Sequence, residues 1–208
     1  MRISRTTRDG ITMLHIHRDE AGLIETLVSQ LMSLYQEYSP PSIELDPLLA
    51  SLDIGGSSSL PDDPALARIL PNAYEDDQQA SEFRQVSEQG LVNRKVLDAE
   101  AVLVSLGSAR LETEGFEGQA EALLHDDLPA YAGAADNETL DVPLDEEAFL
   151  SWTKTLTSMR LALAARLGIE CEEDLDDEPL DEMEANTRAV YDWLAEFTEA
   201  LLHARLNQ

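Results

Sequence analysis

The sequence predicts a mainly α-helical fold, a single-domain helical bundle with an N-terminal β-hairpin. Apolar side chains recur at three- and four-residue spacing over most of the chain, which is the period of an amphipathic helix. Alternation with a period of two, typical of strands, is clearest in the first 18 residues. The chain has 208 residues, 43% of them hydrophobic, which is enough to bury a core. Neither an internal repeat nor a domain boundary divides residues 1–208.

Residues 1–18 are predicted to form the hairpin. Two alternating segments flank Asp9-Gly10, and this dipeptide supplies the positive φ of a tight turn. We expect Leu14 and Ile16 to face inward. Two strands alone are marginally stable, so the hairpin must pack on helices or pair with another strand. The only other strand candidate, and a weak one, is residues 139–142.

Helices are predicted for most of residues 19–106. Pro40 follows the first helical pattern and ends it, while Pro64 suits the first turn of a short helix after a loop at 39–63. Gly90 lies inside the third pattern, which it is expected to kink or split. The predicted helices are residues 19–38, 64–70 and 76–106.

Residues 107–143 are predicted to be an irregular segment because four glycines interrupt them, although 116–125 alone fit an amphipathic helix. Residues 144–206 are predicted to form two C-terminal helices, the first ending before Gly168. An acidic loop at 170–184 joins these two helices.

Charge limits the classes of partner. Asp and Glu number 42 against 14 Lys and Arg, so the formal net charge is -28. Nucleic acid phosphates and anionic membranes repel such a chain, and we do not expect the monomer to bind nucleic acid. No apolar run is long enough for a membrane span and no secretory leader is visible, which predicts a cytoplasmic protein. A basic protein surface is the favoured partner, and a homodimer is compatible with the apolar helix faces.

The charge is also uneven along the chain. The loop at 170–184 contains ten acids and no base, which indicates either a solvated loop or a docking surface for a basic partner. The first 18 residues carry a net charge of +3. Arg2, Arg5 and Arg8 are therefore the candidate nucleic-acid contacts if the hairpin of a symmetric dimer enters a DNA groove.

The motifs of common catalytic and nucleotide sites are missing from the sequence. It contains no Gly-x-Ser-x-Gly elbow, no phosphate-binding P-loop and no Gly-x-Gly-x-x-Gly fingerprint. His15 and His17 share one strand face, but no partner motif completes a four-ligand zinc site. Cys171 lies among Glu170, Glu172 and Glu173, which disfavour its reactive thiolate. We therefore expect a non-enzymatic protein with no catalytic residue, metal or cofactor.

Arginines are scarce in this acidic chain, and most of them fall in predicted helices. Arg68, Arg84, Arg160 and Arg166 each have two interpretations: an ion pair that organises the bundle, or a contact with a partner. Tyr74 follows a proline in a loop-like context and is the aromatic residue we first expect at a contact surface.

Three segments resemble a known family. They read PALARILPNAYEDDQQASEFRQVSEQGLVNRK at 64–95, WTKTLTSMRLALAARLGI at 152–169 and VYDWLAEFTEALL at 190–202. The most specific part is the Leu-Pro-x-Ala-Tyr stretch followed by Glu-Phe-Arg. These segments are similar to the actinobacterial AosR-like family of oxidative-stress transcriptional regulators, long catalogued as a domain of unknown function and often encoded beside the ClpS adaptor.

The resemblance implies a cytoplasmic, mostly helical, non-enzymatic regulator in stress transcription. It also implies a redox-sensitive cysteine pair and a sigma factor or Clp-system component as partner. This sequence departs from the family at Cys171, its single cysteine, so an intrachain disulfide switch cannot form. It also has Thr157-Ser158 where the family has Asn-Asp. We predict a regulator that acts through protein–protein interaction, with DNA reading by the hairpin as the alternative.

Overall fold

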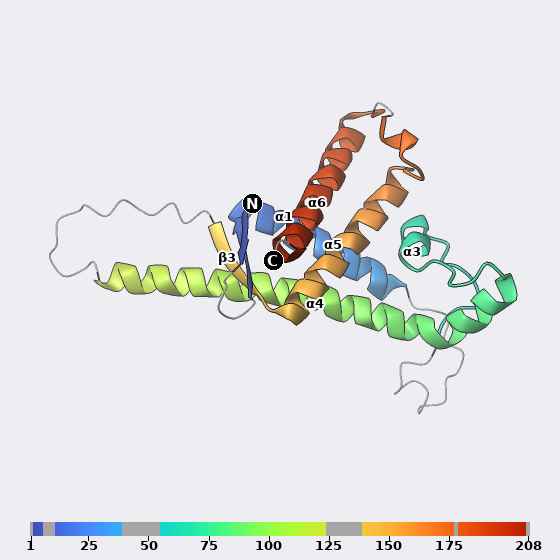
Figure 1. Ribbon diagram of the computed structural model, residues 1–208, viewed down its shortest axis with the longest axis horizontal. Coiled ribbons are helices and arrows are strands. Elements are labelled where there is room, and N and C mark those ends of the chain that lie inside the picture. Colours follow the sequence, from blue (N-terminus) through green and yellow to red (C-terminus); the bar gives the residue numbers. More distant parts are fainter. Residues whose placement is uncertain (1, 6–10, 39–54, 124–138, 177–178, 207–208) are drawn as a thin grey trace.

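A helix of 47 residues, α4 (Asp77–Leu123), runs along the length of the molecule, and helices α1, α5 and α6 lie to one side of it (Figure 1). The computed structural model describes residues 2–5, 11–38, 55–123, 139–176 and 179–206. The other helices are α1 (Arg18–Glu37), α3 (Pro64–Ile69), α5 (Glu146–Arg166) and α6 (Glu182–Leu206), with a 3-10 turn at Glu173–Asp176. The predicted mainly helical class is confirmed.

The strands form a three-stranded antiparallel sheet in the order β1-β2-β3. Their bounds are Arg2–Arg5, Thr12–His17 and Thr139–Leu144. Leu14 and Ile16 are fully buried, as predicted, and pair in register with Val142 and Leu140 of β3. The weak strand candidate at 139–142 is thus a strand. It supplies the third strand that stabilises the two-stranded hairpin.

The predicted irregular segment at 107–143 is wrong at both of its ends, because α4 and β3 extend into it. α4 continues through Gly107 to Leu123, and β3 begins at Thr139; residues 124–138 lie outside the described part of the chain. Gly90 does not split the helix either. A glycine costs a helix about 1 kcal/mol relative to alanine. The burial of Leu106 and Ala109, on either side of Gly107, offsets that cost. Sequence periodicity alone does not reveal this burial.

The core lies between α4, α1, α5, α6 and the sheet. Trp152, Tyr35 and Phe197 are its largest buried side chains. The indole N–H of Trp152 donates to Ser105 Oγ of α4 at 2.9 Å, so this buried polar atom is satisfied. Among the described residues no helix is both long enough and apolar enough to cross a bilayer.

Side chains at the helix ends explain where helices begin and stop. Asp145 caps α5 by accepting a hydrogen bond from the amide of Ala148 at 2.8 Å. Gly168 adopts a φ of 68° just after α5, a conformation that glycine reaches without strain, as the sequence predicted. His17 and Glu20 form a capping box that joins β2 directly to α1.

The continuity of α4 can be tested at Gly107. A Cβ atom there would meet no atom within 4 Å, so Gly107→Ala is expected to raise the free energy of unfolding by roughly 0.5–1 kcal/mol in urea denaturation. Gly56→Ala is the control, because its Cβ would collide with α4, and we expect it to destabilise the protein. Destabilisation by Gly107→Ala would contradict a continuous helix.

Candidate protein-interaction site

The candidate site is a pocket of about 230 Å³ between the end of α3 and the first half of α4. We call it the α3–α4 pocket. Its apolar and polar lining residues come from the segment that joins these helices and from one face of α4. They are Ile69, Leu70, Pro71, Asn72, Ala73, Ala80, Phe83, Arg84, Ser87, Glu88, Leu91 and Lys95.

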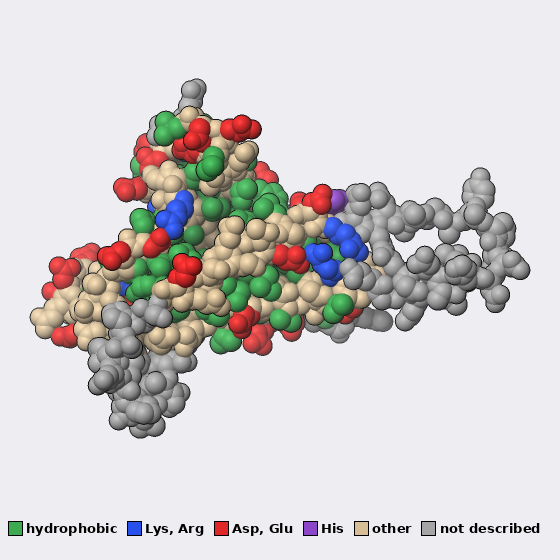
Figure 2. Space-filling model, turned by 180° about the vertical axis from the view of Figure 1, so that it is seen from behind, with side chains coloured by type: hydrophobic (Ala, Val, Ile, Leu, Met, Phe, Trp, Pro, Cys, Tyr) green, Lys and Arg blue, Asp and Glu red, His purple; other side chains and the backbone are tan. Residues whose placement is uncertain are grey.

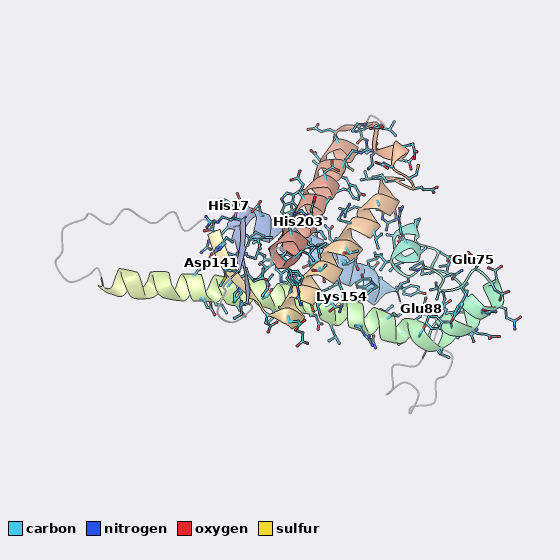
Figure 3. The ribbon with its side chains drawn as sticks, viewed as in Figure 1. His17, Glu75, Glu88, Asp141, Lys154 and His203 are labelled. Atoms are coloured by element: carbon cyan, nitrogen blue, oxygen red, sulfur yellow. The ribbon has the colours of Figure 1, made fainter. Side chains whose placement is uncertain are left out.

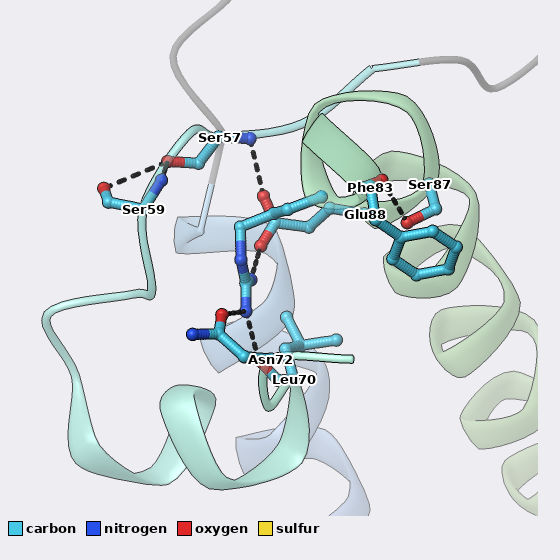
Figure 4. A network of polar contacts seen from close by, with 8 residues as sticks. Ser57, Ser59, Leu70, Asn72, Phe83, Ser87 and Glu88 are labelled. Atoms are coloured by element: carbon cyan, nitrogen blue, oxygen red, sulfur yellow. Dashed lines mark hydrogen bonds and ion pairs between the residues drawn. The ribbon is translucent and has the colours of Figure 1, made fainter. Parts of the chain in front are cut away.

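A buried ion pair between Arg84 and Glu88 lies in the wall of this pocket (Figure 4). Arg84 Nη2 donates to the carbonyl oxygen of Leu70 at 2.7 Å and to Asn72 Oδ1 at 3.2 Å. Glu88 Oε2 accepts a hydrogen bond from the amide of Ser57 at 2.7 Å. The pair therefore holds three segments together: the chain around Ser57, the end of α3, and α4.

The chain at Gly56 must come very close to α4 to make these contacts. A Cβ at Gly56 would lie 2.7 Å from Glu88 Cβ and closer still to the carbonyl of Arg84, so only glycine fits. Gly55 O also accepts a hydrogen bond from the amide of Gln89 at 2.9 Å.

Tyr38 lies near the ion pair. Burial, with the charge of Glu88 adding to it, raises the pKa of Tyr38 to about 12, so its hydroxyl stays protonated.

An exposed aromatic pair lies at the rim of the pocket: Phe83 lines the pocket, and Tyr74 packs against Phe83. The rings of Tyr74 and Phe83 meet edge to face at 5.7 Å, and the two side chains remain 47% and 40% exposed. Exposed large apolar groups of this kind commonly mark contact surfaces. Exposed carboxylates adjoin the pair along the chain, at Glu75, Asp76, Asp77 and Glu82. Glu75 and Glu88 both lie at the end of the molecule away from the sheet (Figure 3).

Lys95 lines the other end of the pocket. It also belongs to a row of polar contacts between α4 and α5, which we call the polar seam and which includes Asp98 and Lys154. Its Nζ donates to Ser158 Oγ at 3.3 Å, and burial lowers the pKa of Lys95 against the opposing charge of Asp98. Asp98 accepts a hydrogen bond from Ser151 and pairs with Lys154 at 3.2 Å. Sequence reasoning missed this seam. The signal was present, because Lys95 and Lys154 are the only lysines in the chain.

The structure places the predicted contact residues at separate locations. Arg84 lines the α3–α4 pocket but is buried. Tyr74 is exposed and packs against Phe83, which also lines the pocket. Arg166 pairs with Asp63, the N-cap of α3, at 2.6 Å. The guanidinium of Arg160 stacks over the ring of Tyr191, 5.1 Å from its centroid. The ion-pair interpretation therefore describes Arg84 and Arg166, whereas Arg160 makes a cation–π contact.

The predicted nucleic-acid contacts fall largely outside the described atoms. Arg2 is exposed on the edge strand β1, whereas Arg8 and the side chain of Arg5 are not described. The histidines of β2 have structural partners: His15 Nδ1 lies 2.6 Å from Asp141 Oδ1, and His17 caps α1. In the part of the chain that is described, no group of three or more His, Cys, Asp or Glu side chains could hold a metal ion.

The acidic segment after α5 is partly ordered by its own carboxylates. Asp174 accepts hydrogen bonds from the amides of Glu170 and Cys171 at 2.7 and 2.9 Å, which lower the pKa of Asp174. Arg188 of α6 donates to the carbonyl oxygens of Asp174 and Leu175. α6 begins at Glu182, so only part of the predicted loop at 170–184 is a loop; residues 177–178 lie outside the described chain.

These features define a mainly helical protein with a small antiparallel sheet, an acidic surface on which basic side chains appear at only a few places (Figure 2), and an aromatic-rimmed pocket. The chain belongs to the family described as a domain of unknown function, DUF2017, whose model matches residues 1–205. Comparison with curated proteins and with solved structures finds no match.

The buried ion pair predicts a large effect of removing one charge. Glu88→Gln leaves the Arg84 guanidinium buried without its counter-ion, and we expect the free energy of unfolding in urea to fall by about 3–5 kcal/mol. Replacing both residues, as Arg84→Met with Glu88→Leu, is expected to cost less than the single change. Equal losses in the single and double variants would contradict a coupled pair.

Cys171 is expected to be a slow nucleophile. The thiol is exposed, but its hydrogen bond to the Glu173 carboxylate raises the pKa of Cys171, so less thiolate forms at neutral pH. Alkylation by iodoacetamide should be slower than that of free cysteine, with its pH profile displaced to higher pH. Glu173→Gln should shift the profile back toward lower pH, and an alkylation rate above that of free cysteine would contradict the assignment.

Proposed function

We propose that this protein is a non-enzymatic interaction module whose α3–α4 pocket binds a basic segment of a partner protein. The observation that carries the proposal is the exposed Tyr74–Phe83 pair, held at the pocket rim beside the buried Arg84–Glu88 pair. Two adjoining aromatic rings with accessible faces offer a large contact area at low cost in side-chain entropy.

The chemistry of the rim favours a basic, partly apolar ligand. Four exposed carboxylates adjoin the aromatic pair along the chain and complement Lys or Arg side chains: Glu75, Asp76, Asp77 and Glu82. The pocket beside Phe83 and Leu91 accommodates an apolar side chain of the same segment. A short peptide that combines an apolar residue with neighbouring basic residues meets both requirements.

The wall of the pocket is preorganised for such a ligand. Hydrogen bonds from Arg84 and to Glu88 fix the pocket before any partner binds. A binding surface that is already ordered loses little conformational entropy on association. The net charge of -28 would in addition steer a basic partner toward the protein and make its capture sensitive to salt.

The regulatory setting is part of the proposal and rests on the resemblance to AosR-like regulators. Within that setting, the protein is a cytoplasmic component of stress-responsive transcription, and its partner is a sigma factor or a Clp-system component. Tyr74, Phe83 and Arg84 all lie within the segment that carries the most specific part of the resemblance. The motif thus coincides with the pocket, which supports the view that the pocket is the shared binding site.

The proposal predicts that Tyr74→Ala with Phe83→Ala abolishes capture of a partner. The tagged protein would be incubated with native cytoplasm at low and at high salt, and bound proteins would be quantified by mass spectrometry. We expect one basic protein to be recovered, and its amount to fall at least tenfold both in the double variant and at high salt.

The matched control is Leu150→Ala with Leu202→Ala, which truncates two comparably exposed side chains on α5 and α6. This control should capture the partner as the unmodified protein does. Equal capture by the Tyr74/Phe83 variant would overturn the pocket as the binding site. Recovery of nucleic acid alone would favour the hairpin alternative instead.

A further inference from the structure

Helix α4 carries a second apolar face, opposite the one that it buries. Leu97, Val104 and Leu111 are 64%, 66% and 71% exposed. Val104 lies two residues from both Val102 and Leu106, which are buried, so it projects from roughly the opposite side of the helix. We call Leu97, Val104 and Leu111 the outer stripe.

The spacing of the outer stripe is that of a helix-pairing seam. Its members are seven residues apart, so they follow one line along about 21 Å of the helix. A helix covered on one side only is normally polar on the other. Apolar residues at seven-residue intervals on the free side are the pattern by which one helix packs against another. Ala101 and Ser108, which lie between the members, are small enough to allow close approach.

Charge indicates what covers this stripe. Residues 89–112 contain three bases (Arg94, Lys95, Arg110) and three acids (Asp98, Glu100, Glu112), so this section is neutral in a chain of net charge -28. A basic partner gains no attraction from a neutral section. A second copy of the same acidic chain, in contrast, can approach most readily where neither copy carries excess negative charge.

Two exposed charges fit an antiparallel pairing of α4 with itself. Arg94 and Glu112 are 18 residues apart, which is five full turns, so they project from the same side of the helix. Arg94 has no ion-pair partner among the residues that the structure describes. With a two-fold axis near residues 103–104, Arg94 of each copy faces Glu112 of the other, and two equivalent ion pairs form.

We infer that the outer stripe is the interface of a homodimer in which two α4 helices pack antiparallel about residues 103–104. In this arrangement Val104 of one copy lies beside Val104 of the other, and Leu97 lies beside Leu111. The interface is independent of the α3–α4 pocket, because its apolar contacts do not need a basic ligand and persist at high salt.

Light scattering after size-exclusion chromatography tests the dimer. The unmodified protein is expected at twice the chain mass of 23.0 kDa at both low and high salt. Val104→Asp should convert it to a monomer without loss of helical circular dichroism, since Val104 is exposed. Leu180→Asp makes a similar charge change at a highly exposed leucine outside α4 and should remain dimeric. A monomeric unmodified protein, or a dimeric Val104→Asp variant, would overturn the inference.

The charge pair provides a test of orientation. Arg94→Glu and Glu112→Arg should each weaken dimerisation at least tenfold, because each single change places like charges opposite one another twice. The double variant exchanges the two charges and should restore the affinity of the unmodified protein. Failure of the double variant to recover would overturn the antiparallel pairing.

Cysteine cross-linking gives a second, independent measure of orientation in a Cys171→Ser background. Under mild oxidation V104C should cross-link to itself. L97C should not cross-link to itself but should do so when mixed with L111C. Self-cross-linking of L97C together with V104C would show a parallel pair and overturn the proposed arrangement.

Discussion

The burial of one face of α4 is the constraint on which the rest of the structure depends. α1, α5 and β3 all pack against this helix, and Ala99, Val102 and Leu106 supply its buried side. The helix must stay continuous to serve all of these neighbours, which is why its glycines are tolerated. The contacts supply more stabilisation than the glycines remove, since helix stability in proteins comes mainly from packing. Both proposed surfaces include residues of this one helix.

The scarce cations act mainly as links between elements. Arg110 joins α4 to α1 through Glu25, Arg166 joins α5 to the cap of α3, and Arg205 joins α6 to α5 through Glu146. Each of these exposed pairs contributes little free energy alone. In a chain of net charge -28, each of these arginines places a positive charge where two acidic elements meet. The buried Arg84–Glu88 pair differs, because loss of either residue leaves the other as an unpaired charge in the protein interior.

The pocket and the outer stripe lie on sections of α4 that differ in charge. The first half of the helix carries the aromatic rim among acids, a surface complementary to a basic segment. The later section is neutral and apolar, a surface complementary to itself. Salt therefore separates the two proposed interactions: it screens the attraction of a basic partner and leaves apolar packing between copies largely intact. A dimer built in this way would present two pockets to the same or to separate partners.

The amino-acid sequence by itself determined the helical class, the end of α5 at Gly168, and the inward direction of Leu14 and Ile16. These follow from local periodicity and from backbone preferences of single residues. Tertiary structure alone decided that α4 passes through Gly107, that β3 completes the sheet, and that the Arg84–Glu88 pair meets Leu70 and Ser57. Each of these depends on contacts between residues distant in the chain, whose free energy outweighs local propensity. The pocket could be anticipated at Arg84, a scarce cation in a predicted helix, and beside it at Tyr74, an aromatic residue in a loop-like context. Phe83 and Lys95 join the pocket only after folding.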